Sequence, residues 1–81
     1  MIRPLSWRSE SGMQVLYLGE IPIGRMAPNG SGKLGSHRWL FHLAGHTPGT
    51  AAFWHAENGE TAARAALLAA ANTWLNRAGW V

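Results

Sequence analysis

The sequence predicts an α+β domain in which an antiparallel sheet of three to five short strands is covered by one C-terminal helix. Before residue 57, short runs of β-branched, aromatic and aliphatic residues alternate with turn-forming residues. After it, an alanine-rich segment keeps helical spacing up to a glycine. A chain of 81 residues forms one domain, with the sheet over about 5–56 and the helix over about 59–77.

The first predicted strands lie on either side of a turn. Leu5–Arg8 alternates apolar and polar residues, which is typical of a short edge strand. Ser9–Gly12 has the composition of a turn, and Met13–Leu18 is rich in β-forming residues.

A second hairpin follows directly. Gly19 and Glu20 predict a two-residue turn of the type with glycine first, and Ile21–Met26 then forms the returning strand. Pro22 has no amide hydrogen to donate to a neighbouring strand. Its amide side should therefore face a sheet edge or a bulge.

Two loops and two further strands complete the predicted sheet. Pro28–Ser36 and Gly45–Gly49 are predicted loops, and Ala51–Ala56 is the last predicted strand. Between the loops, Arg38–Leu43 alternates as a strand does. Trp39, Phe41 and Leu43 should share one face of it, and Arg38, Leu40 and His42 the other.

The C-terminal helix has start and stop signals at both ends. Asn58 is a suitable N-cap, and Glu60 and Arg77 suit the positive and negative ends of the helix dipole. Gly79 is a fitting stop. The predicted core stripe is Ala63, Leu67, Ala70, Ala71, Trp74 and Ala78, widened by Leu68 and Leu75, while Asn72, Thr73 and Asn76 face water.

Composition limits the classes of function. The chain has no cysteine, which excludes disulfides and thiolate metal sites and suits a reducing cytosol. Seven Lys and Arg residues against four acidic residues give a net charge of +3, and only 14% of residues are charged. With so few charged residues the surface should be unusually apolar, and such a surface often marks a site for a partner protein. No apolar run is long enough to span a membrane, and the N-terminus lacks the pattern of a signal peptide.

The motifs that would indicate an enzyme or a cofactor are incomplete. Gly32-Lys33 resembles part of a phosphate-binding loop, but Ala27 and Leu34 stand where that motif needs glycine and a hydroxyl residue. A catalytic site in this chain would have to function without cysteine or aspartate, because the sequence contains neither. The sequence therefore predicts a non-enzymatic protein without a cofactor or metal, and its four histidines are expected at the surface or the core rim: His37, His42, His46 and His55.

Basic residues gather around the first long loop and supply the candidate binding site. Their charges can steer an acidic partner toward the loop. Trp39 and Phe41 interleave with them as in some single-strand-binding proteins, but their predicted face is opposite to that of the neighbouring arginine. The candidate binding residues are Arg25, Lys33, His37 and Arg38, joined by Arg3 and Arg8 in one basic patch.

The run Tyr17–Met26, then Trp39, then the helix end Trp74–Gly79, resembles small proteins of phages and prophages in GC-rich proteobacteria. Anti-CRISPR proteins, which inhibit host surveillance complexes by covering a surface, are among them. The resemblance covers most of the chain, and it carries no functional residue over by motif. Many anti-CRISPR proteins are acidic DNA mimics, whereas this chain is basic, so direct occlusion of a Cas subunit is the version that fits.

The resemblance thus implies a cytoplasmic inhibitor, active in a bacterial host, that binds a type I effector complex (Cascade) and blocks its capture of target DNA. Two alternatives stay open from the residues alone. One is a small accessory protein that binds nucleic acid directly, and the other is a structural domain whose apolar surface forms a homodimer.

Overall fold

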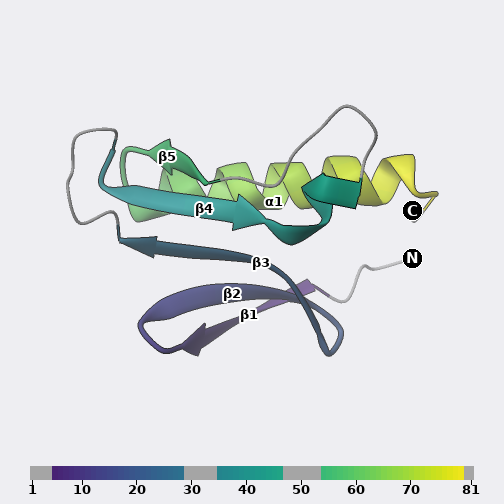
Figure 1. The fold of residues 1–81 in the computed structure, drawn as a ribbon, viewed down its shortest axis with the longest axis horizontal. Helices are drawn as coiled ribbons and strands as arrows, with labels where there is room; N and C mark the ends of the chain where they lie inside the picture. The colour runs from purple at the N-terminus through teal and green to yellow at the C-terminus, as the bar shows by residue number, and fades with distance from the viewer. Residues whose placement is uncertain (1–4, 29–34, 47–53, 80–81) are drawn as a thin grey trace.

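The computed structural model describes residues 5–28, 35–46 and 54–79, and it confirms the predicted fold class. One antiparallel sheet has the strand order β1-β2-β3-β4-β5, so every strand pairs with its neighbour in the chain. The single α-helix of the described ranges lies along β4 and β5 on one side of the sheet (Figure 1). The elements are β1 (Leu5–Glu10), β2 (Met13–Leu18), β3 (Ile21–Pro28), β4 (His37–Phe41), the 3₁₀ helix η1 (His42–His46), β5 (His55–Glu57) and α1 (Glu60–Arg77).

The first hairpin is longer than the sequence predicts. Ser9 and Glu10 belong to β1 and pair with β2, so the predicted four-residue turn over Ser9–Gly12 is wrong. Only Ser11 and Gly12 form the turn, both with positive φ, at 51° and 78°. Such two-residue turns match the twist of the flanking strands and let pairing continue to the last residue. The other predicted turn, at Gly19, is confirmed by its φ of 62°.

A bulge separates Pro22 from the rest of β3. Leu16 pairs with Gly24 while Tyr17 pairs with Pro22, which leaves Ile23 as the extra residue. Pairing with β4 covers only Gly24–Pro28, so the missing amide hydrogen of Pro22 interrupts no pairing on that side. The prediction for Pro22 is confirmed. The bulge has a second effect, because Ile23 and Leu16 both enter the hydrophobic core.

The chain leaves the sheet earlier than predicted after β4. The strand ends at Phe41, and His42 and Leu43 belong to η1, so the strand predicted to run through Leu43 is wrong. His42 explains the change of direction, because its ring hydrogen-bonds to Arg25 and to the carbonyl of Pro22 on β3. The predicted loop at Gly45–Gly49 begins inside η1, and its residues 47–49 lie outside the described part.

The last strand is short and shifted. β5 has three residues and pairs with β4 through His37–Glu57, Arg38–Ala56 and Trp39–His55. Trp54 precedes the strand, which corrects the predicted strand at Ala51–Ala56, and residues 51–53 lie outside the described part. Of the predicted loop at Pro28–Ser36, residues 29–34 also lie outside the described part. Its first residue, Pro28, is the last residue of β3.

At each end of α1, a backbone amide donates a hydrogen bond. The N-cap is Gly59 without a side-chain cap, so the prediction of Asn58 is wrong. The residue directly before β4 supplies the contact instead, because the Gly59 amide donates to Ser36 Oγ at 2.7 Å. At the other end, Gly79 takes a φ of 85° and its amide donates to the Asn76 carbonyl at 3.1 Å, so the predicted stop is confirmed. No helix in the described ranges is both long and apolar enough to cross a membrane.

The core lies between α1 and the strands β2, β3 and β4. The helix packs tightly against the sheet at Gly24, where an added Cβ would lie 2.7 Å from Leu67 Cδ1. Ala78 is exposed because it is the C-cap, so its predicted place in the stripe is wrong, and Ala70 and Trp74 are only half-buried. The buried helix residues are four positions apart: Ala63, Leu67, Ala71 and Leu75.

Candidate functional site

The two faces of the sheet differ in what covers them. The single α-helix of the described chain packs on one face, so we call the opposite face the open face. The pairing register assigns its residues, because partners across a ladder point to the same side. One row across four strands runs Arg8, Val15, Arg25 and Leu40, and flanking rows hold Tyr17 and, farther along, Ala27, Arg38 and Ala56.

At the β1–β2 end of the open face, carboxylates compensate the positive charge. The Arg8 guanidinium lies 4.1 Å from the centre of the Tyr17 ring and donates to both carboxylate oxygens of Glu20 at 3.4 Å. The Tyr17 hydroxyl donates to Glu10, and this hydrogen bond raises the pKa of the tyrosine. One cation therefore meets two carboxylates here, which leaves this end without a free positive charge.

At the centre of the open face, Arg25 is held by a histidine. Its Nε–H donates to His42 Nε2 at 2.9 Å, while His42 Nδ1 lies 3.3 Å from the Pro22 carbonyl oxygen. This arrangement requires a neutral ring that carries its proton on Nδ1. Burial, with help from the Arg25 charge, lowers the pKa of His42, and the Pro22 carbonyl opposes this effect. The outcome is an oriented guanidinium that has no carboxylate partner among the described residues.

At the β4–β5 end, a second guanidinium lies on an aromatic ring. Arg38 is exposed and lies 4.6 Å from the centre of the Trp54 ring, which itself is 38% exposed. Arg38 pairs with Ala27 and Arg25 with Leu40, so the two arginines are diagonal neighbours on adjacent strands. Like Arg25, Arg38 has no carboxylate partner in the described ranges. These two side chains form the positive part of the open face.

The structure brings together three of the six predicted binding residues. Arg8, Arg25 and Arg38 lie on the open face. His37 faces the helix side, where it lines a hollow of about 170 Å³ with Gln14 and Glu60, so its predicted place in the patch is wrong. Strand alternation explains this, because His37 and Arg38 are consecutive. Arg3 and Lys33 lie outside the described residues.

The prediction that Trp39 and Arg38 point to opposite faces of their strand is confirmed. Trp39 points to the helix side, stacks on His55 with ring centres 4.5 Å apart and donates to Glu57 at 3.3 Å. Phe41 is 4% exposed in the core beside it. The interleaved aromatics near the first loop therefore pack on the helix side, opposite to Arg38.

Sequence reasoning missed the partners of the arginines. Tyr17, Trp54 and His42 each contact one arginine of the open face. The two-residue turn at Ser11–Gly12 could have identified the first pair, because it fixes Arg8 opposite Val15 and Ser6 opposite Tyr17. The other two depend on contacts between segments distant in sequence.

Arg64 was also missed, and it has a structural role. Its Nη2 donates to Glu60 at 2.9 Å and to Gln14 of β2, and its guanidinium lies 5.4 Å from the centre of the Trp7 ring. It therefore ties α1 to the β1–β2 hairpin on the helix side.

The open face has the chemistry of a binding surface. Among the described residues, its three arginines and the glutamates Glu10 and Glu20 sum to a net charge of +1, because Arg25 and Arg38 contribute +2 and the Arg8 end contributes −1. Among the described residues, no group of three or more His, Asp or Glu side chains could hold a metal ion.

No protein-family model matches this chain, and neither a curated protein nor a solved structure shows significant similarity to it. The function is therefore argued from the site itself.

Proposed function

We propose that this protein is a non-enzymatic inhibitor that uses the open face to cover an acidic surface of a host protein complex. The observation that carries the proposal is the pair Arg25 and Arg38. They are neighbours on the sheet face opposite α1, each is oriented by an aromatic or imidazole ring, and neither has a carboxylate partner among the described residues. Arginines held in this way lose little conformational entropy on binding a carboxylate.

A protein partner fits this surface better than a nucleic acid does. Phosphate binding favours a dense basic stripe, whereas the described residues of the open face carry a net charge of +1, with two carboxylates at the β1–β2 end. Its aromatic rings at Tyr17 and Trp54 are already covered on one face by guanidinium groups. Arginine, tyrosine and tryptophan are the residue types enriched in protein–protein interfaces.

The sequence resemblance supplies the target class of the proposal. It suggests a protein of phage origin, similar to anti-CRISPR proteins, that occludes a Cas subunit of a type I surveillance complex in the bacterial cytoplasm. The open face adds the mechanism. A basic patch with fixed guanidinium groups binds an acidic patch on the subunit and so prevents the complex from capturing target DNA.

The experiment measures target-DNA binding by a reconstituted type I surveillance complex in the presence of increasing inhibitor. Wild type should abolish DNA capture, and the double variant Arg25→Gln/Arg38→Gln should need about ten-fold more protein or beyond for the same effect. The matched control is Ala62→Glu/Ala65→Glu, which changes the net charge equally on an exposed part of α1. This control should inhibit as wild type does.

Other outcomes would overturn parts of the proposal. Sub-micromolar binding of the protein to bare DNA, with affinity falling steeply as salt rises, would favour the nucleic-acid alternative. A size that doubles with concentration and shields the open face would favour the homodimer. If no type I complex is inhibited, the anti-CRISPR assignment fails, whereas equal loss of inhibition in the control variant would reject only the open face.

A further inference from the structure

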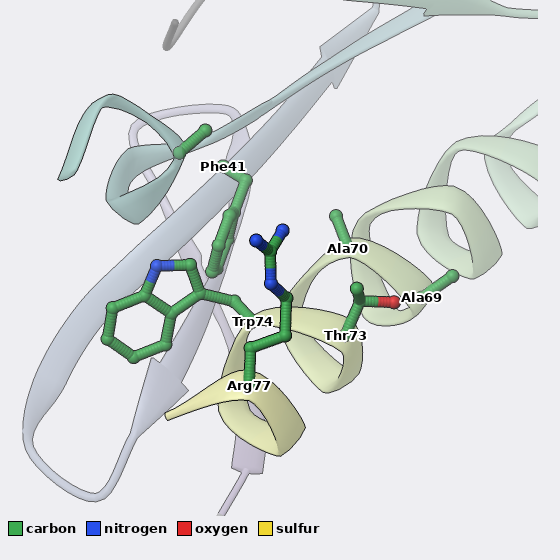
Figure 2. A pocket seen from close by; sticks show the side chains of 7 residues that line it. Phe41, Ala69, Ala70, Thr73, Trp74 and Arg77 are labelled. Atoms are coloured by element: carbon green, nitrogen blue, oxygen red, sulfur yellow. The ribbon is translucent and has the colours of Figure 1, made fainter. Parts of the chain in front are cut away.

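A pocket lies away from the open face, between the C-terminal half of α1 and the start of η1 (Figure 2). The pocket has a volume of about 320 Å³. This is at the lower end of the range for small-molecule sites, so the occupant would have on the order of ten non-hydrogen atoms. The lining residues are Phe41, Ala44, Ala69, Ala70, Thr73, Trp74 and Arg77.

The pocket has an aromatic floor and alanine walls. Phe41 and Trp74 meet edge to face, with ring centres 6.4 Å apart and planes inclined by 68°. Phe41 is fixed in the core, whereas Trp74 is half-buried and presents part of its ring to the pocket. Ala44, Ala69 and Ala70 end at Cβ and so leave the space above the rings open. An apolar, preferably flat group is the chemistry that such walls would bury.

The edge of the pocket carries one cation. Figure 2 shows the Arg77 side chain extended back from the last turn of α1, with its guanidinium beside Trp74 and directed toward Phe41 and Ala70. Arg77 has no carboxylate partner within the described ranges. Of the other lining residues, only Thr73, with its hydroxyl, and Trp74, with its indole N–H, carry a polar group, and neither is charged. The ligand must therefore satisfy one guanidinium at the edge of an otherwise apolar hollow.

We infer that this pocket binds a small carboxylate with an aromatic or branched apolar body, whose carboxylate accepts hydrogen bonds from Arg77. A planar guanidinium matches a carboxylate through two parallel hydrogen bonds. A neutral apolar ligand would cover the guanidinium without a partner, which costs binding free energy. A phosphate dianion would find only one cation and apolar walls. The pocket is separate from the open face, and this inference does not depend on the function proposed for the open face.

The test uses three probes with the same phenyl group and three-carbon chain but different charge: 3-phenylpropionate, 3-phenylpropanamide and 3-phenylpropylamine. Binding is followed by titration of the backbone and indole resonances of the ¹⁵N-labelled protein. The carboxylate should shift the Trp74 indole and bind about ten-fold or more tightly than the amide. The amine should bind more weakly than the amide, because it meets a like charge.

Variants distinguish the contribution of the Arg77 cation to binding from that of the apolar pocket. Arg77→Gln should reduce the affinity for 3-phenylpropionate to that of the amide while leaving the amide unaffected. Ala69→Leu, at an exposed position that tolerates a larger side chain, should weaken both probes by occupying the pocket. Ala62→Glu makes the same change in net charge as Arg77→Gln near the start of the helix and should not alter binding.

Two results would overturn the inference. One is equal affinity for carboxylate and amide in the wild type, which would remove the role of Arg77. The other is no saturable shift at Trp74 with any probe, which would remove the pocket as a ligand site. Thermal melts of each variant identify those that fail to fold, and Ala69→Leu and Arg77→Gln change the pocket at different points, so one folded variant suffices for the comparison.

Discussion

The two faces of the sheet are built from the same strands but hold opposite chemistry. On the helix side, Leu16 and Leu67 are fully buried and Gly24 lets the helix approach. On the open face, Arg25 and Arg38 rest on a histidine and a tryptophan. Because consecutive strand residues point to opposite sides, one short strand can contribute to the core and to a binding surface at once. Stability and binding can therefore be changed separately in this protein.

The energetic difference between the faces should be large. Burying a leucine contributes roughly 1.5–3 kcal/mol, and removing one from a packed core costs more because a cavity remains. Exposed ion pairs contribute about 0–1 kcal/mol. Substitutions on the helix side should therefore reduce the free energy of unfolding far more than those on the open face.

The largest effect is expected at Leu67. Leu67→Ala should lower the free energy of unfolding by about 2–5 kcal/mol, because the side chain is 0% exposed and packs against the sheet at Gly24. Urea melts of Leu67→Ala and Arg38→Gln measure the comparison directly, and Arg38→Gln should change stability by less than about 1 kcal/mol. Equal losses in the two variants would contradict the assignment of the faces.

The next effect concerns the close approach at Gly24. Gly24→Ala should cost about 1–3 kcal/mol, since the new Cβ would lie 2.7 Å from Leu67 Cδ1 and 3.2 Å from the Leu40 carbonyl oxygen. Denaturant melts of a double-mutant cycle with Leu67→Ala test the cause. The double variant should lose less than the sum of the two single losses, because the shortened side chain makes room. Strict additivity would place the cost elsewhere.

A smaller effect should depend on pH at His42. Its pKa is lowered below 6.5 in the folded protein, mainly by burial, so the unfolded chain takes up the proton first. The stabilisation is therefore complete above about pH 6.5 and is lost as the pH falls toward the lowered value. Thermal midpoints of wild type and His42→Gln, measured from about pH 7.5 down to about pH 5, span the ordinary pKa of histidine and should converge at low pH. A difference that stays constant with pH would show that His42 does not titrate in this way.

The smallest effect is expected at the compensated end of the open face. Glu20→Gln breaks the ion pair with Arg8. The Arg8 side chain is 44% exposed and the Glu20 side chain is 87% exposed. Stability should change by less than about 0.5 kcal/mol, because water screens both groups. Urea melts at low and high salt provide the measurement. A loss above about 1 kcal/mol at low salt would mean that this end contributes to folding as the helix side does.

The sequence by itself predicted those features whose cause is local. The hairpin turn at Gly19, the helix stop at Gly79 and the strand over Met13–Leu18 are where the residues place them. Positive φ favours glycine, and runs of β-formers or of alanine favour one backbone conformation, so no distant contact is needed for them. The fold class followed because these local preferences agree with one another.

Tertiary contacts decided the features whose cause lies far away in the chain. The early end of β4 coincides with the contacts of His42 with Arg25 and Pro22, and the N-cap of α1 lies at Gly59, whose amide donates to Ser36. For the candidate site, the sequence supplied the arginines, but only the pairing register put Arg8, Arg25 and Arg38 on one face and His37 on the other. A shift of one residue in any strand would have reversed that assignment, because side chains alternate along a strand.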